Sequence, residues 1–182
     1  MSALSYVKRI TFTAVCIALC IVLPMALHSI PNAGTVLSPM HIPVLLCGLI
    51  CGWPFGLLAG LMAPLLSSAV TGMPGPAYLP PMMLELAVYG FLSGLLMQLV
   101  HTKKLYADLY ISLLTAMLAG RLVSGAAQAL IFTGGSYSLQ LWITSYFITS
   151  LPGIVIQLLL IPVLVAALMR SRLIPTRYSS SI

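Results

Sequence analysis

The sequence predicts an all-α integral membrane protein, a bundle of six transmembrane helices with both termini in the cytoplasm. Of its 182 residues, 60% are apolar and only 5% are charged, whereas an ordinary soluble domain has about 25% charged residues. This composition excludes a soluble enzyme, a disordered chain and a disulfide-stapled secreted domain. We therefore expect residues 1–182 to form a single transmembrane domain.

Apolar segments of suitable length give the helix count. Five segments approach the roughly 20 residues that a transmembrane helix needs, and the last is long enough to tilt or to extend beyond the bilayer. A further run, about 42–52, is short, but it has 18 residues when extended back to Thr35. The five segments cover about 10–28, 54–70, 80–100, 108–132 and 141–169.

The basic residues set the orientation. In a six-pass chain, seven of them fall on one side, which should be the cytoplasm because Lys and Arg are enriched there. In a five-pass chain, two of the seven would lie on one side of the membrane and five on the other. They lie at helix boundaries rather than in a basic patch with aromatic residues, so the net charge of +6 does not indicate nucleic-acid binding. The seven are Lys8, Arg9, Lys103, Lys104, Arg170, Arg172 and Arg177. One alternative, a re-entrant hairpin at 35–70, leaves the other orientations unchanged.

The predicted outer loops contain no Lys, Arg, Asp or Glu, and they are rich in Pro and Gly. They cover about 29–41, 71–79 and 133–140. Two interpretations stay open. The loops could pack on the bundle as a lid over a site that opens outward, or they could be short connectors with ordinary turn residues.

Small residues recur at four-residue spacing, which puts them on one helix face and allows close helix contact. For Gly48/Gly52, Gly56/Gly60 and Gly90/Gly94 we expect packing inside the bundle. The four cysteines, Cys16, Cys20, Cys47 and Cys51, form two pairs spaced by four residues. This is not the two-residue spacing of zinc and redox sites, so we expect no metal site.

Two charged residues inside the membrane, Glu85 and Arg121, mark a candidate site, because such residues are expensive there and usually functional. Each shares a helix face with polar neighbours, and a third polar stripe lies on the last segment. These faces should converge on a polar pocket in the outer half of the bundle. The three stripes are Glu85, Tyr89 and Ser93; Arg121, Ser124 and Gln128; and Trp142, Tyr146 and Ser150.

Alternatives to a binding pocket remain. Glu85 and Arg121 could form a structural ion pair with no ligand, or a pair that holds the empty site until a ligand rearranges it. A proton-coupled carrier or channel would use Glu85 as its titrating group, although the sequence places no His or second acid beside it in the membrane. Enzyme signatures such as Gly-x-Ser-x-Gly and His-Glu-x-x-His are absent, and no phosphate-binding loop is present. We therefore expect no enzyme activity and no cofactor.

Several stretches resemble the substrate-binding S components of energy-coupling-factor (ECF) vitamin transporters. The likeness is carried by residues 41–48 (HIPVLLCG), 52–56 (GWPFG), 60–65 (GLMAPL), 72–74 (GMP) and 85–90 (ELAVYG). Ala14-x-x-x-Ala18 is similar to the small-residue coupling motif of that family. Chain length, six helices and inside termini also agree, so the resemblance covers most of the chain.

The resemblance implies a subunit that binds a water-soluble vitamin or vitamin precursor from outside. Its partners would be a transmembrane coupling protein, which meets the Ala14/Ala18 face, and two ATPases, in the plasma membrane of a bacterium or archaeon. Pyridoxine, a pyrimidine or thiazole precursor, pantothenate and a cobalamin fragment are compatible ligands, and a ring-bearing, mostly neutral one is favoured. The candidate substrate-binding residues are Glu85, Tyr89, Arg121, Ser124, Gln128, Trp142, Tyr146, Asn32 and His41.

Overall fold

The computed structural model describes residues 4–27, 29, 32–129 and 138–178. In this part of the chain, six spans are long and apolar enough to cross a membrane, and no strand occurs. The predicted fold class, an all-α membrane bundle, is therefore confirmed. The spans are α1 (Tyr6–Ala26), the pair α2 (Ala33–Leu37) and α3 (His41–Cys51), α4 (Trp53–Thr71), α5 (Leu79–Leu99), α6 (Leu105–Ala127) and α8 (Leu151–Arg170).

The second span is broken, and its inner part lies in the middle of the bundle. α2 ends at Ser38, whose φ of 47° lies in the left-handed region, and α3 begins three residues later. α3 has 11 residues, about 16 Å at 1.5 Å per residue, so it is too short to span a bilayer alone. Nearly all of its residues are buried, and a broken helix is tolerated at membrane depth when protein surrounds it. Together α2 and α3 supply an apolar stretch of 18 residues, Gly34–Cys51, which is long enough to cross a membrane.

The last predicted segment, 141–169, is not continuous. It divides into α7 (Leu139–Ile143), a π-helix (Thr144–Thr149) and α8, which begins after Ser150. Pro152 lies in the first turn of α8, where its missing N–H is tolerated, but it could not continue a helix arriving from the π-turn. The expectation of one long helix here is wrong. Most of the predicted outer loop 133–140 lies outside the described residues, and the first predicted outer loop contains α2.

Glycines bring α3, α4 and α5 into backbone contact, which confirms their predicted packing role. A Cβ added at Gly90 would collide with the backbone of Gly56 on α4, and one at Gly48 would collide with the carbonyl of Gly90. Gly60 likewise faces the carbonyl of Leu86. Such close approach of small residues is a main source of helix association in membranes, where the lipid is as apolar as the side chains.

Replacing Gly90 by Ala should therefore separate α4 from α5. We expect the free energy of unfolding in detergent to fall by about 1–3 kcal/mol, the usual range for overpacking. Gly34→Ala is the matched control, because nothing lies within 4 Å of a Cβ added there. Thermal unfolding of both variants measures the difference, and an equal loss in the two would contradict the close-contact explanation.

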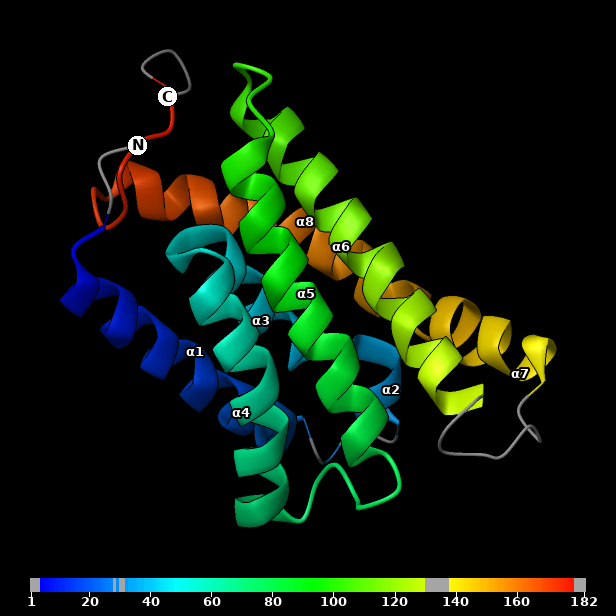
Figure 1. Cartoon of the computed structure of the whole chain (residues 1–182). Helices are drawn as coiled ribbons and strands as arrows, with labels where there is room; N and C mark the ends of the chain where they lie inside the picture. The colour runs from blue at the N-terminus through cyan, green and yellow to red at the C-terminus, as the bar shows by residue number, and fades with distance from the viewer. Residues whose placement is uncertain (1–3, 28, 30–31, 130–137, 179–182) are drawn as a thin grey trace.

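The two ends of the bundle differ in charge. Both termini lie at the end that carries the 100–104 connection between α5 and α6, and the seven basic residues named above belong to segments at this end (Figure 1). We call it the basic end. α2, α7 and the 72–78 connection lie toward the opposite end (Figure 1). This separation agrees with the predicted helix directions.

Candidate functional site

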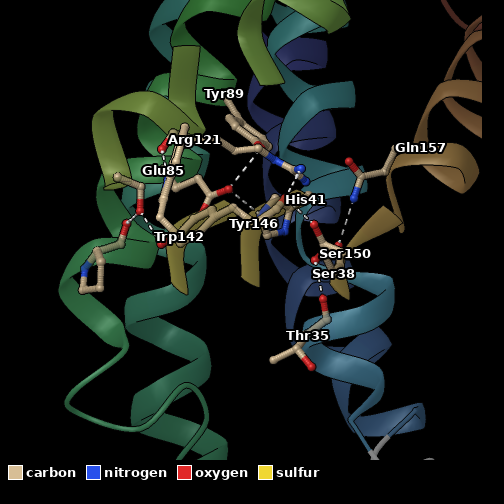
Figure 2. A network of polar contacts seen from close by, with 12 residues as sticks. Thr35, Ser38, His41, Glu85, Tyr89, Arg121, Trp142, Tyr146, Ser150 and Gln157 are labelled. Carbon is tan, nitrogen blue, oxygen red and sulfur yellow. Dashed lines mark hydrogen bonds and ion pairs between the residues drawn. The ribbon is translucent and has the colours of Figure 1, made fainter. Parts of the chain in front are cut away.

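Buried polar side chains from α3, α5 and α6 meet inside the bundle (Figure 2). His41 and Glu85 lie in the parts of α3 and α5 that are away from the basic end. The side chains of Glu85, Tyr89 and Arg121 are all at least 90% buried. Trp142 and Tyr146, from the α7 and π-helical segment, lie beside them (Figure 2). The sequence analysis predicted this convergence of three polar stripes.

A tyrosine hydroxyl joins the two charged groups at the centre of the site. Tyr89 Oη donates to Glu85 Oε1 at 3.0 Å, and Arg121 Nε donates to Tyr89 Oη at 2.9 Å. The structure has no ion pair within 4 Å between Glu85 and Arg121, so it does not contain the direct pair that was one alternative from the sequence. Tyr89 follows Glu85 by one helical turn and therefore lies on the same face, where its hydroxyl occupies the space between the two charges.

A glycine makes room for this tyrosine. A Cβ at Gly120 would collide with the ring of Tyr89, so the ring lies directly against the backbone of α6. Arg121 is the next residue on α6, which brings its guanidinium within reach of the Tyr89 hydroxyl. The Gly-Arg pair at 120–121 thus positions both partners.

His41 adds a third ionisable group. It is the first residue of α3, as expected for a residue at a helix boundary. Its Nε2 lies 3.5 Å from Glu85 Oε1, and its ring packs edge-on against Tyr89 with 5.2 Å between centroids. The expectation that no histidine lies beside Glu85 is therefore wrong, because the break before α3 returns His41 to the face of α5. Its buried Nδ1 has no hydrogen-bond partner among the described residues.

The segment of α7 and the π-helix covers the Arg121 side of the site. Arg121 Nη1 donates to the Tyr146 carbonyl oxygen, and the guanidinium lies 5.4 Å from the centroid of the Phe147 ring. The Tyr146 hydroxyl is 2.9 Å from Ser124 Oγ. Trp142 Nε1 donates to the Arg121 carbonyl oxygen at 3.2 Å. This segment therefore supplies aromatic surface next to a buried cation.

Two polar residues that the sequence analysis did not list as ligands, Ser38 and Gln157, extend the network toward α8. Gln157 Nε2 donates to the Ser38 carbonyl oxygen at 3.4 Å, and this carbonyl is accessible because α2 ends there. Gln157 Oε1 is buried and has no hydrogen-bond partner among the described residues. A glutamine in the middle of an apolar span was the available signal for Gln157, and Ser38 lies in a predicted loop directly before Pro39, where a helix is disfavoured.

Seven of the nine predicted site residues come together in this network: His41, Glu85, Tyr89, Arg121, Ser124, Trp142 and Tyr146. Asn32 lies exposed at the start of α2, and Gln128 lies at the C-terminal end of α6. Ser93, from the same face as Glu85, lies deeper and donates to the Gly90 carbonyl oxygen. No group of three His, Cys, Asp or Glu residues suited to a metal occurs in the described part of the chain.

Removing the hydroxyl of Tyr89 should weaken this site. Tyr89→Phe leaves Glu85 and Arg121 each without one buried hydrogen bond, and a bond to a charged group contributes about 1.5–3 kcal/mol. We expect the thermal stability in detergent to fall clearly. Tyr110→Phe removes the same hydroxyl from an exposed position on α6 and should leave the thermal stability unchanged. Equal stability of the two variants would contradict the bridging role of Tyr89.

The comparison with family models gives one match. The model described as ECF transporter, substrate-specific component, matches residues 8–165. The matched range includes α1 through most of α8 and every residue of the network described above. Searches of curated proteins and of solved structures gave no match.

Proposed function

Because the chain belongs to the family of ECF transporter substrate-specific components, we propose that it captures a water-soluble vitamin or vitamin precursor and delivers it inward with an ATP-driven module. Membership makes it a substrate-specific membrane subunit of a transporter, not a member of an enzyme family. We further propose that residues 1–182 act as one substrate-binding domain. The observation that carries the proposal is the buried Glu85–Tyr89–Arg121 bridge beside an aromatic segment.

The charges of the network favour a mostly neutral ligand with a ring. Glu85 and Arg121 are both held by one hydroxyl, so their opposite charges offset each other without a ligand charge. Trp142 and Tyr146 offer aromatic surface for a heterocycle. Buried polar groups nearly always have partners, so the unpaired His41 Nδ1 and Gln157 Oε1 favour a ligand with polar substituents. Pyridoxine, pyrimidine or thiazole precursors, pantothenate and cobalamin fragments remain the candidates.

The distribution of charge supports capture from outside. Basic residues are enriched on the cytoplasmic side of membrane proteins, so the basic end and both termini would face the cytoplasm. The Glu85 site, in the part of the bundle away from that end, would then open to the outside of the plasma membrane of a bacterium or archaeon. The segments 71–79 and 138–149 would form the outer cover, and Asn32 would be the ligand contact from α2.

Coupling to ATP hydrolysis would come from partner proteins. The sequence contains no phosphate-binding loop, so the energy would be supplied by a transmembrane coupling protein and two ATPase subunits. Ala14 and Ala18 are exposed on α1, and most of this helix is not buried within the chain. Exposed small residues allow another helix to approach closely, which supports the proposed contact with the coupling protein.

Thermal unfolding of the detergent-purified protein against a panel of vitamins and precursors tests the binding proposal. A ligand at 100 times its dissociation constant adds about 2.7 kcal/mol of stability, so a tight ligand should raise the melting temperature by several degrees. We expect one compound class to do so without ATP or partner proteins. Equal melting temperatures across the panel, confirmed by equilibrium dialysis with labelled compounds, would contradict this ligand range.

A self-sufficient proton-coupled carrier is the second candidate, and one observation favours it. Glu85 and His41 are both buried and lie 3.5 Å apart, so two titratable groups share the site. A proton could pass between a carboxylate and an imidazole at such a site. A proton-coupled carrier should transport its ligand alone in a pH gradient. A binding subunit of an ATP-driven transporter should show no transport under the same conditions.

A further inference from the structure

A cavity of about 480 Å³ opens at the basic end, far from the Glu85 site in the chain's fold. It lies between the start of α1 and the segment that follows α8. Two basic side chains, two hydroxyls and several apolar side chains line it. The lining residues are Leu4, Ser5, Lys8, Met169, Arg172, Leu173, Ile174, Pro175 and Thr176.

The wall of this cavity is held in place by the C-terminal segment. The chain reverses at Arg172, whose φ of 57° is left-handed, and Ile174 is then buried in the core. Arg177 Nε lies 2.7 Å from Asp108 Oδ2, and the Tyr178 hydroxyl donates to the same oxygen at 2.6 Å. These contacts anchor the segment on both sides of Pro175 and hold the wall of the cavity in place.

The cavity has cations but no carboxylate to neutralise them. The chain contains only two Asp and Glu residues. Glu85 belongs to the site described above, and Asp108 is paired with Arg177. Lys8 and Arg172 make no ion pair in the described part of the chain. No Asp or Glu side chain therefore lines this cavity, and among the described residues its lining is positively charged.

We propose that this cavity binds the phosphate headgroup of an anionic phospholipid. Lys8 and Arg172 would contact the phosphate, since both are suited to phosphate oxygens, and the hydroxyls of Ser5 and Thr176 would donate to the remaining oxygens. Leu173, which is exposed, would lie along the first carbons of the acyl chains. Basic pockets at the cytoplasmic ends of transmembrane helices commonly bind anionic headgroups. This site is separate from the proposed vitamin site and does not depend on it.

A short-chain lipid titration tests the proposal on the full chain in detergent. The probes are dihexanoyl phosphatidylglycerol, dihexanoyl phosphatidylcholine with the same acyl chains, and inorganic phosphate. The readout is the melting temperature and, from its concentration dependence, the apparent affinity. The test variant is Lys8→Gln with Arg172→Gln, and the matched control is Lys103→Gln with Lys104→Gln, which removes two charges from the same end outside the cavity.

We expect phosphatidylglycerol to stabilise the wild-type protein more than the other two probes. Each basic residue near an anionic lipid surface contributes about fivefold in affinity, so the Lys8/Arg172 variant should bind it about 30-fold more weakly. The Lys103/Lys104 variant should bind it within about threefold of wild type. An equal loss in both variants would show diffuse charge attraction and overturn the proposal. Full stabilisation by inorganic phosphate would also overturn it, because the site would then take a free anion.

Discussion

Arg121→Ala is expected to weaken ligand binding strongly. Its guanidinium donates to the Tyr89 hydroxyl and to the Tyr146 carbonyl oxygen, so its loss removes the side chain that joins α5 and the aromatic segment through α6. Truncating one member of a buried charged network changes binding free energies by about 2–5 kcal/mol. We therefore expect at least about a 30-fold loss of affinity, measured by isothermal titration with the compound that the thermal screen identifies.

A control variant shows whether the loss of affinity comes from the site or from removing any positive charge. Arg170→Ala removes the same side chain from an exposed position at the end of α8 and should bind the ligand as wild type does. Arg121→Lys keeps the charge but lacks the planar fork of donors, so its affinity should fall between the two. Unchanged affinity in an Arg121→Ala variant that remains folded by gel filtration would remove Arg121 from the binding site.

Ala14→Trp and Ala18→Trp are expected to separate binding from transport. Both alanines are exposed on α1 and lie away from the polar network, so ligand affinity should stay within about twofold of wild type, as for other surface substitutions. A bulky side chain on a small-residue face prevents close helix approach. Uptake by the reconstituted complete transporter should then fall to background.

Leu19→Trp provides the matched control on the same helix. Leu19 is also exposed, but one residue after Ala18 it points about 100° around the helix axis. This variant should retain uptake. If all three tryptophan variants transport equally, the proposed contact of the coupling protein with the Ala14/Ala18 face is wrong.

The sequence was sufficient to predict the spans because apolar length and charge distribution are strong signals in a membrane protein. The five long segments match α1, α4, α5, α6 and α8 at most boundaries within a few residues. The helix breaks were harder to predict. The turn at Ser38 lies in a predicted loop, but the short helix α2 ahead of it was not predicted. The π-helix before Ser150 lies within a predicted apolar segment, where length gives no information on continuity.

The candidate site could also be predicted only in part: helical spacing predicts its polar faces but not all of the contacts between them. Helical spacing placed Glu85 and Tyr89 on one face, and Arg121 and Ser124 on another, and these faces meet as predicted. Local spacing did not predict the hydroxyl bridge, because it depends on Gly120, which allows the Tyr89 ring to lie against α6. His41 reached Glu85 through the break before α3, a tertiary effect that local spacing does not encode.

Uptake into liposomes shows whether the chain is a binding subunit that needs an ATP-driven module or a carrier that works alone. The chain is reconstituted alone, with a pH gradient and no other protein, or together with the coupling protein and two ATPases of the proposed module. We expect labelled ligand to accumulate only with the module and ATP, whereas the chain alone should bind the ligand without transporting it. Accumulation by the chain alone, driven by the pH gradient and lost in Glu85→Gln, would contradict this expectation and establish a proton-coupled carrier.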